Sequence, residues 1–247
     1  MVVAAFAAGA LNAVAGGGSF LTFPTLVFVG LPAVIANATN TVALFPGAFA
    51  SAYSYRHGIA RLEGISLRAM LVVSVIGGAL GALLLLVTPE ADFVALTPWL
   101  LLFATVMFAF GGQAGAALKR RVHFGFRALV ISQFVIAVYG GYFGGGIGIL
   151  MLAALAIFGM TDLSAMNGIK TMLSGVLNGV AVVVFVVHGS VYWREALIMM
   201  GAGIAGGYYG AVLAQKLPGK VLRTFVICVG VAMTAYFFVH AYKSKAT

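Results

Sequence analysis

The sequence predicts an all-α polytopic membrane protein with two homologous repeats, each a glycine-broken helix, re-entrant or discontinuous, plus three transmembrane helices. The prediction rests first on composition, since 63% of the 247 residues are hydrophobic, 8% are charged and the mean hydropathy is +1.12. Soluble domains carry about 25% charged residues. It rests second on long uncharged runs, which suit helical spans and not the short alternating strands of an outer-membrane barrel. Third, short motifs recur along the chain.

Five motifs of the first half recur in the second half in the same order, displaced by 128 to 131 residues. One pair could arise by chance in a chain with 33 glycines, but five in one order indicate an internal duplication. We therefore divide the chain into transmembrane repeat 1 (residues 1–118), a basic connecting loop (119–127) and transmembrane repeat 2 (128–247). The five pairs are Gly16–Gly18 with Gly144–Gly146, Gly30 with Gly159, Asn40-Thr41 with Lys170-Thr171, His57-Gly58 with His188-Gly189, and Gly77–Ala82 with Gly206–Ala211.

The expected helices follow from the positions of charges, glycines and prolines. Residues 1–55 carry no charged side chain, a run far too long for one span, and Gly30 with Pro32 ends one helix and starts the next. Charged residues bound most of the other runs. We expect first-half elements at Val2–Gly30, Ala33–Tyr55, Leu67–Val87 and Pro98–Leu118, and second-half elements at Phe124–Phe158, Leu163–Val187, Arg194–Gln215 and Val221–Ala241.

Two topologies are compatible with these elements. If each glycine-broken element crosses the bilayer, the chain has eight spans and parallel repeats; if each turns back, it has six spans, two re-entrant hairpins and inverted repeats. Loop charges do not separate the two, because either threading puts ten Lys and Arg on one side. Length favours the hairpin, since residues 128–161 are 34 uncharged positions and one span needs about 20.

The formal net charge of +9 comes from 14 Lys and Arg against 5 Asp and Glu. In a membrane protein this excess reflects basic loops that face anionic cytoplasmic lipid, so we expect lipid contacts and no nucleic-acid partner. The sequence has no His/Cys/Asp cluster at metal-ligand spacing, no plausible Ser/His/Asp constellation and no phosphate-binding loop. We therefore expect no enzymatic activity, no metal and no cofactor.

The triple glycines Gly16–Gly18 and Gly144–Gly146 are poor helix formers. Backbone that leaves the helix at membrane depth is tolerated only inside protein or against a water-filled cavity. A helix that restarts after such a break points free N–H groups and its positive dipole end at the break, an arrangement that binds anions. The alternative is that these glycines only let helices pack closely, which is the interpretation we favour for Gly77–Gly81 and Gly206–Gly210.

Lys170 is the only formal charge between Asp162 and Arg194. A cation at membrane depth costs roughly 2.5–3.5 kcal/mol on insertion scales, so something negative should meet it. No acidic residue lies nearby in its own segment. Its partner is therefore either a carboxylate on another helix or a ligand.

Other polar residues accompany Lys170 on the same expected helix, at spacings that put them all on one face. Such a face either lines a cavity or makes interhelical hydrogen bonds. Asn40 and Thr41 hold the equivalent positions in the first half. The stripe consists of Asn167, Lys170, Thr171, Ser174 and Asn178.

These motifs resemble the sulfite exporter TauE/SafE family over essentially the whole chain. In the first half the similarity lies in Asn12-x-x-Ala15-Gly-Gly-Gly-Ser-Phe-x-x-Phe-Pro24, Gly30-Leu-Pro and Ala36-Asn-Ala-Thr-Asn-Thr. In the second half it lies in Gly141-x-x-Gly144-Gly-Gly, Asn167-Gly-Ile-Lys170, Asn178 and Gly206-Gly-x-x-Gly-Ala. The resemblance implies a secondary carrier of the bacterial inner membrane that moves anions, often sulfur-containing ones such as sulfite, sulfonates or thiosulfate.

We therefore expect a multi-pass transporter that binds a small anionic substrate and works by alternating access. An anion channel and a non-transporting membrane subunit are the alternatives. The particular anion, the direction of transport, the coupling ion and the existence of a homo-oligomer stay open. The candidate substrate-binding residues are Gly16, Gly17, Gly18, Ser19, Asn40, Thr41, Gly144, Gly145, Gly146, Asn167, Lys170, Thr171 and Asn178.

Overall fold

Every regular element that the computed structural model describes is an α-helix. The described residues are 1–14, 16–56, 66–119, 125–158, 160–214 and 219–243. The helices of the first half are α1 (Val2–Val14), α2 (Ser19–Phe28), α3 (Ala33–Ser54), α5 (Leu67–Val87) and α6 (Glu90–Lys119). Those of the second half are α7 (Phe126–Tyr142), α8 (Ile147–Ile157), α9 (Leu163–Val187), α10 (Trp193–Ala214) and α11 (Gly219–Lys243).

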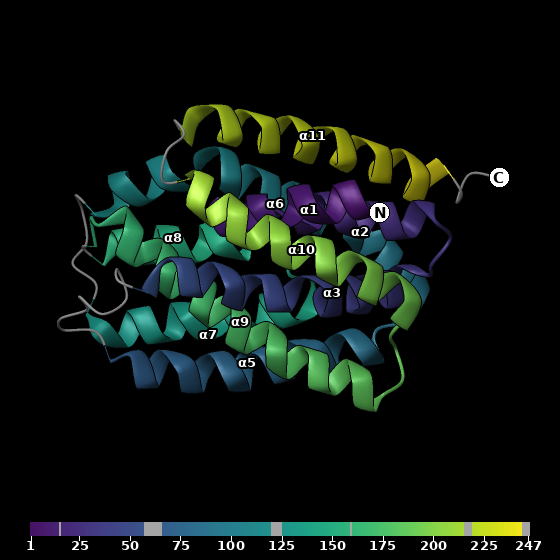
Figure 1. Ribbon diagram of the computed structural model, residues 1–247, viewed down its shortest axis with the longest axis horizontal. Coiled ribbons are helices and arrows are strands. Elements are labelled where there is room, and N and C mark those ends of the chain that lie inside the picture. The colour runs from purple at the N-terminus through teal and green to yellow at the C-terminus, as the bar shows by residue number, and fades with distance from the viewer. Residues whose placement is uncertain (15, 57–65, 120–124, 159, 215–218, 244–247) are drawn as a thin grey trace.

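Four of the described helices, α3, α5, α6 and α9, are long and apolar enough to cross a membrane. They lie side by side along one axis with the other helices, which gives an elongated bundle (Figure 1). The chain is therefore a polytopic helical protein, in agreement with the predicted class. Helix α6 ends at Lys119 and α7 begins at Phe126, and most of the expected basic connecting loop lies outside the described residues.

Most helix bounds agree with the expected ones to within two residues, but the start of α6 does not. We expected this helix to begin at Pro98, whereas it begins eight residues earlier at Glu90 and contains Pro98 in its interior. Glu90 and Asp92 fall in the first turn, where acidic side chains suit the positive end of the helix dipole. The Thr97 hydroxyl donates to the Phe93 carbonyl at 2.8 Å, next to the place where proline removes a backbone donor.

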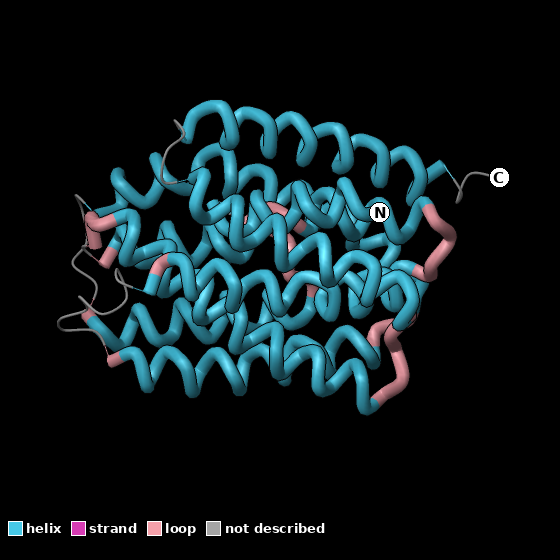
Figure 2. Tube along the Cα trace, viewed as in Figure 1, coloured by secondary structure: helices cyan, strands magenta, loops and turns pink. Residues whose placement is uncertain are grey.

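Each glycine-broken element folds back on itself. A Cβ added to Gly18 would lie 2.4 Å from the Ala8 carbonyl oxygen, which requires the start of α2 to lie beside α1. In the second half, Ile147 at the start of α8 touches Gly140 of α7 in the same way. The α1–α2 and α7–α8 hairpins enter the bundle from opposite ends, and both breaks lie inside it (Figures 1 and 2).

The long helices α3 and α9, which follow the two hairpins, cross each other in antiparallel fashion. Gly175 of α9 packs against the Phe49 ring, and Gly179, one turn later, packs against Phe45, one turn earlier in α3. The terminal helices of the two halves, α6 and α11, are also antiparallel, since Gly230 faces Thr105 while Phe238 faces Trp99.

Glycines bring several helix backbones into direct contact, as the close-packing interpretation predicted. A Cβ on Gly206 of α10 would lie 2.0 Å from the Phe6 carbonyl oxygen of α1. One on Gly81 of α5 would lie 2.1 Å from the Val138 carbonyl oxygen of α7. These positions leave no room for any side chain.

Candidate functional site

Both first arms of the hairpins end in the same backbone turn. Gly16 after α1 has a φ of +82°, and Gly144 after α7 has a φ of +77°. The Gly16 N–H donates to the Leu11 carbonyl at 2.9 Å and the Gly144 N–H to the Tyr139 carbonyl at 3.4 Å, five residues back in each case. A left-handed φ is open to glycine and strained for other residues, so both breaks need a glycine at this position.

The second arms begin differently. The N–H of Gly18, the residue before α2, donates to the side-chain oxygen of Asn12 at 2.7 Å, so Asn12 bridges the first break. At α8 the residue before the helix is Gly146, with a φ of +75° and no side-chain cap. The N–H groups of Ile147 and Gly148 have no hydrogen-bond partner within the described residues. The positive end of α8 therefore keeps two free donors.

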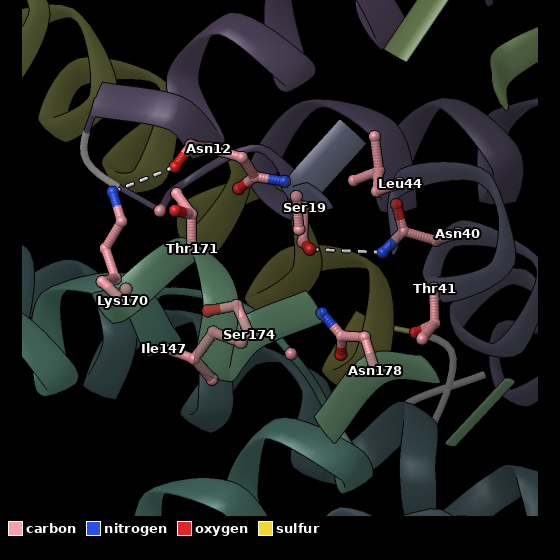
Figure 3. A pocket seen from close by; sticks show the side chains of 14 residues that line it. Asn12, Ser19, Asn40, Thr41, Leu44, Ile147, Lys170, Thr171, Ser174 and Asn178 are labelled. Atoms are coloured by element: carbon pink, nitrogen blue, oxygen red, sulfur yellow. Dashed lines mark hydrogen bonds between the residues drawn. The ribbon is translucent and has the colours of Figure 1, made fainter. Parts of the chain in front are cut away.

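The two breaks touch each other in the middle of the bundle. A Cβ added to Gly16 would lie 2.5 Å from the Gly148 Cα, which is a direct contact between the backbones of the two hairpins. A pocket of about 40 Å³ lies against this contact (Figure 3). Its lining residues are Asn12, Gly16, Ser19, Asn40, Thr41, Leu44, Ala48, Gly144, Ile147, Gly148, Lys170, Thr171, Ser174 and Asn178.

Lys170 is 1% exposed, and its amine binds three neutral oxygens. It donates to the backbone carbonyls of Asn12 at 3.1 Å and Ala13 at 3.0 Å, and to the side-chain oxygen of Asn167 at 2.9 Å. Among the described residues the partner is therefore not a carboxylate, the first of the two alternatives that the sequence left open. It is the C-terminal end of α1, where unpaired carbonyls carry the negative end of the helix dipole.

Asn40, the first-half equivalent of Lys170, belongs to a hydrogen-bonded group at the start of α2. Its side-chain nitrogen donates to the Ser19 hydroxyl at 3.2 Å, and its side-chain oxygen accepts from the Thr22 hydroxyl. Figure 3 shows Asn40 on the opposite side of the view from Lys170, with Ser19 between them.

One turn before Asn40, Asn37 makes a contact that corresponds to that of Lys170. Its side-chain nitrogen donates to the Tyr142 carbonyl, at the C-terminal end of α7, at 2.9 Å. Asn37 is 1% exposed, and its side-chain oxygen has no hydrogen-bond partner among the described residues. Each long helix therefore binds the end of the other half's broken helix.

Eight of the thirteen predicted site residues line the pocket: Gly16, Ser19, Asn40, Thr41, Gly144, Lys170, Thr171 and Asn178. The other five do not line the pocket, but they form or contact the turns and side chains that do. Gly17 and Gly18 form the turn into α2, Gly145 accepts a hydrogen bond from the Tyr139 hydroxyl, Gly146 precedes α8, and Asn167 accepts from Lys170.

Sequence reasoning omitted six lining residues from the site: Asn12, Leu44, Ala48, Ile147, Gly148 and Ser174. Ser174 stood in the predicted stripe, and Asn12 stood in the family motif. Leu44 and Ala48 follow Asn40 at intervals of four, so they share its helix face, but a search for polar residues passes over them.

The described residues contain no group of three or more His, Cys, Asp or Glu side chains that could hold a metal ion. His188 is exposed, with its Nδ1 2.8 Å from the Ser190 hydroxyl, and lies away from the pocket lining. His57 and Arg61 lie outside the described residues. Asp162 caps α9, because its side chain accepts from the Ser164 and Ala165 N–H groups.

A family model and several curated relatives match most of the chain. The family described as "Sulfite exporter TauE/SafE" matches residues 1–237. A "Probable membrane transporter protein" of Haemophilus influenzae is 30% identical over 233 residues, which cover 93% of this chain and 90% of the relative. A "Probable membrane transporter protein ORF9" of Sinorhizobium sp is 29% identical over 94% of this chain and 89% of the relative.

The "Probable membrane transporter protein YfcA" of Escherichia coli K12 is 24% identical over 94% of this chain and 86% of that protein. No solved structure matches the chain. The family and these relatives indicate a membrane transporter rather than an enzyme. The chain belongs to the sulfite exporter TauE/SafE family.

Proposed function

We propose that this protein is a secondary transporter of small anions in the bacterial inner membrane, working by alternating access. The anions are sulfur-containing ones (sulfite, sulfonate or thiosulfate) or related organic anions. One observation carries the proposal: Lys170 is the only charged residue that lines the central pocket within the described chain. The dipole of α1 offsets part of that charge, since a helix end is equivalent to roughly half an elementary charge. The pocket therefore keeps a positive potential.

The donors around the pocket fit an oxyanion. Ile147 and Gly148, whose N–H groups are free, line the same pocket as the Ser19 hydroxyl and the Asn178 amide. Such an arrangement of helix N-terminus and hydroxyl or amide donors satisfies the oxygens of a small anion. The volume of about 40 Å³ corresponds to roughly three waters, which favours a guest of a few heavy atoms.

The proposed binding residues divide into two roles. Those that line the pocket, Gly16, Ser19, Asn40, Thr41, Gly144, Lys170, Thr171 and Asn178, would contact or attract the anion. The remaining ones, Gly17, Gly18, Gly145, Gly146 and Asn167, would hold the two breaks and the Lys170 amine in position.

We further propose that the two halves are inverted repeats. The antiparallel pairing of α3 with α9 and of α6 with α11 supports this relation. The pocket lining supports it too, because four pairs of lining residues are separated by 130 positions. These pairs are Asn40 with Lys170, Thr41 with Thr171, Leu44 with Ser174, and Ala48 with Asn178. Inverted repeats around a central site are a common basis of alternating access.

The substitution Asn12→Asp tests the proposed positive pocket. The carboxylate has the shape of the amide and still accepts from the Gly18 N–H, but it adds a negative charge beside Lys170. We expect the variant to fold with a melting temperature near that of wild type. It should lose uptake of radiolabelled sulfite into proteoliposomes, because the local charges then cancel.

The matched control is Asn12→Ala, which removes the contact with the Gly18 N–H and adds no charge. We expect it to lower the melting temperature and to retain part of the sulfite uptake. Sulfite uptake by Asn12→Asp at the wild-type rate would contradict the proposal. A thermal-shift screen of wild type with sulfite, sulfate, thiosulfate, sulfonates and carboxylates identifies the anion. An anion current through the protein that is far larger than the turnover of a carrier would indicate a channel.

A further inference from the structure

The helices around the pocket form two groups joined by backbone-to-backbone contacts, and these groups do not coincide with the two halves of the sequence. In the α10 group (α1, α3 and α10), backbones touch through glycines, since a Cβ on Gly47 would lie 2.8 Å from the Gly203 carbonyl oxygen. In the α5 group (α5, α7 and α9), a Cβ on Gly78 would lie 2.7 Å from the Leu177 carbonyl oxygen. Each group takes two helices from one half and one from the other.

Buried hydrogen bonds reinforce each group. In the α10 group the Ser51 hydroxyl donates to the Gly207 carbonyl at 3.0 Å. In the α5 group the Gln133 side chain donates to the Ser74 hydroxyl at 2.9 Å. Because interiors packed backbone to backbone do not deform gradually, each group should move as a unit.

The boundary between the groups is of a different kind, and the pocket lies on it. Here α3 and α9 pack closely, but through the side chains of Phe45 and Phe49 rather than backbone to backbone. Two contacts made by buried polar side chains cross this boundary, one at each hairpin. Lys170 of the α5 group binds the end of α1, and Asn37 of the α10 group binds the end of α7.

All three N–H donors of the Lys170 amine are already engaged in hydrogen bonds. An ammonium group has three N–H donors, and its three acceptors lie at 2.9, 3.0 and 3.1 Å. An anion that takes a hydrogen bond from this amine must displace an α1 carbonyl or Asn167. Since α1 and α9 share few other contacts, loss of the α1 carbonyls would separate the end of α1 from α9.

We propose that Lys170 clasps the α10 group to the α5 group through the end of α1, and that an anion in the pocket opens this clasp by competing for the amine. The inference rests on the proposed function, because it requires that an anion enters the pocket. It assigns the moving parts of the cycle to the two groups rather than to the two sequence repeats. Asn37 is the equivalent clasp at the other hairpin.

Hydrogen–deuterium exchange at the two breaks tests the clasp, with sulfite as the probe and sodium chloride of equal ionic strength as the control. An ordinary ligand slows exchange around its site. Competition for Lys170 predicts the opposite at the first break, where sulfite should speed exchange of the peptide 11–20 about tenfold, the scale of one charge-assisted hydrogen bond. Sulfite should slow exchange at Ile147 and Gly148, which face the pocket.

Three variants complete the test. Lys170→Met should show fast exchange in peptide 11–20 without sulfite and no further response to it, and Lys170→Arg should restore slower exchange because it keeps donors and charge. Asn37→Leu is the matched control, since it should speed exchange around Gly144 and leave peptide 11–20 unchanged. If Lys170→Met does not fold, the response of wild type to sulfite remains decisive.

Slower exchange in peptide 11–20 of wild type on sulfite binding would overturn the proposal. So would a folded Lys170→Met protein whose exchange in this peptide equals that of wild type. A wild-type protein that neither binds nor transports any anion in the thermal-shift screen would refute the proposed function, and with it the competition. The comparison of Lys170→Met with Asn37→Leu would still show whether Lys170 holds the end of α1.

Discussion

Gly16 combines two constraints that act on a single residue. Its φ of +82° lies in the left-handed region, and its Cα faces the Gly148 backbone across the contact between the hairpins. Gly30 shares only the first constraint, because its φ is +101° and nothing lies within 4 Å of the position of a Cβ. Substitutions at Gly16 and Gly30 therefore distinguish the energetic cost of backbone strain from the cost of losing the contact between the two breaks.

We expect Gly30→Ala to cost about 1–2 kcal/mol, the energy of left-handed backbone for an L-residue. Gly16→Ala should cost more and should abolish anion uptake, because its Cβ would lie 2.5 Å from the Gly148 Cα and must push the hairpins apart. Thermal unfolding of the purified variants in detergent measures the difference. Equal melting temperatures for the two variants would show that the hairpins do not depend on this contact.

The sequence indicated which residues matter at the site better than it indicated what they touch. Lys170 was singled out because its charge has no acidic neighbour, but its partners are carbonyls at the end of α1. Every residue has a carbonyl group, so no residue type signals this partner. Asn12 illustrates the same limit, since its role depends on the fold of the break that brings it to Gly18.

At the level of the elements, charged residues and glycines predicted the helix bounds well where they lie at the ends of helices. The bounds of α5 and α9 are those expected, Leu67–Val87 and Leu163–Val187. Pro98 was misleading because proline often opens a helix, while here it lies inside α6. The duplicated glycine motif of α10 also has a definite role, in that Gly206 and Gly210 face the backbone of α1 and Gly207 faces that of α3.

A matched pair of substitutions on α10 tests that packing. Gly206→Ala should destabilise the protein by about 1–3 kcal/mol, because its Cβ would lie 2.0 Å from the Phe6 carbonyl oxygen and α1 must move. Gly201 has nothing within 4 Å of the position that a Cβ would take, so Gly201→Ala should gain up to about 1 kcal/mol of helix propensity. Melting temperatures that fall equally in both variants would argue against the backbone contact.

For the whole molecule, the sequence left two topologies open, one with re-entrant hairpins and one in which the glycine-broken elements cross the membrane. In the bundle, α1 and α2 occupy the same end, so the residues before α1 and after α2 lie together (Figure 1). The end of α3 and the starts of α5 and α7 lie at the other end (Figure 1). The sequence places Arg56, Arg68 and Arg127 within two residues of these helix ends. The positive-inside rule then predicts that this basic end faces the cytoplasm.

Single-cysteine labelling of whole cells distinguishes the hairpin from a crossing element. The single native cysteine, Cys228, is first replaced by serine. Val3 and Val29 are 82% and 51% exposed and flank the α1–α2 hairpin. We expect a membrane-impermeant maleimide added outside spheroplasts to label Val3→Cys and Val29→Cys alike, because both lie on the periplasmic side of a re-entrant hairpin.

Phe126→Cys serves as the control from the basic end, where Phe126 is 41% exposed at the start of α7. It should react only after the membrane is permeabilised. If α1 and α2 together crossed the bilayer, Val29→Cys would behave like Phe126→Cys and not like Val3→Cys. Because a crossing element in each half would make the repeats parallel, that pattern would also remove the geometric basis for two hairpins meeting at one central anion site.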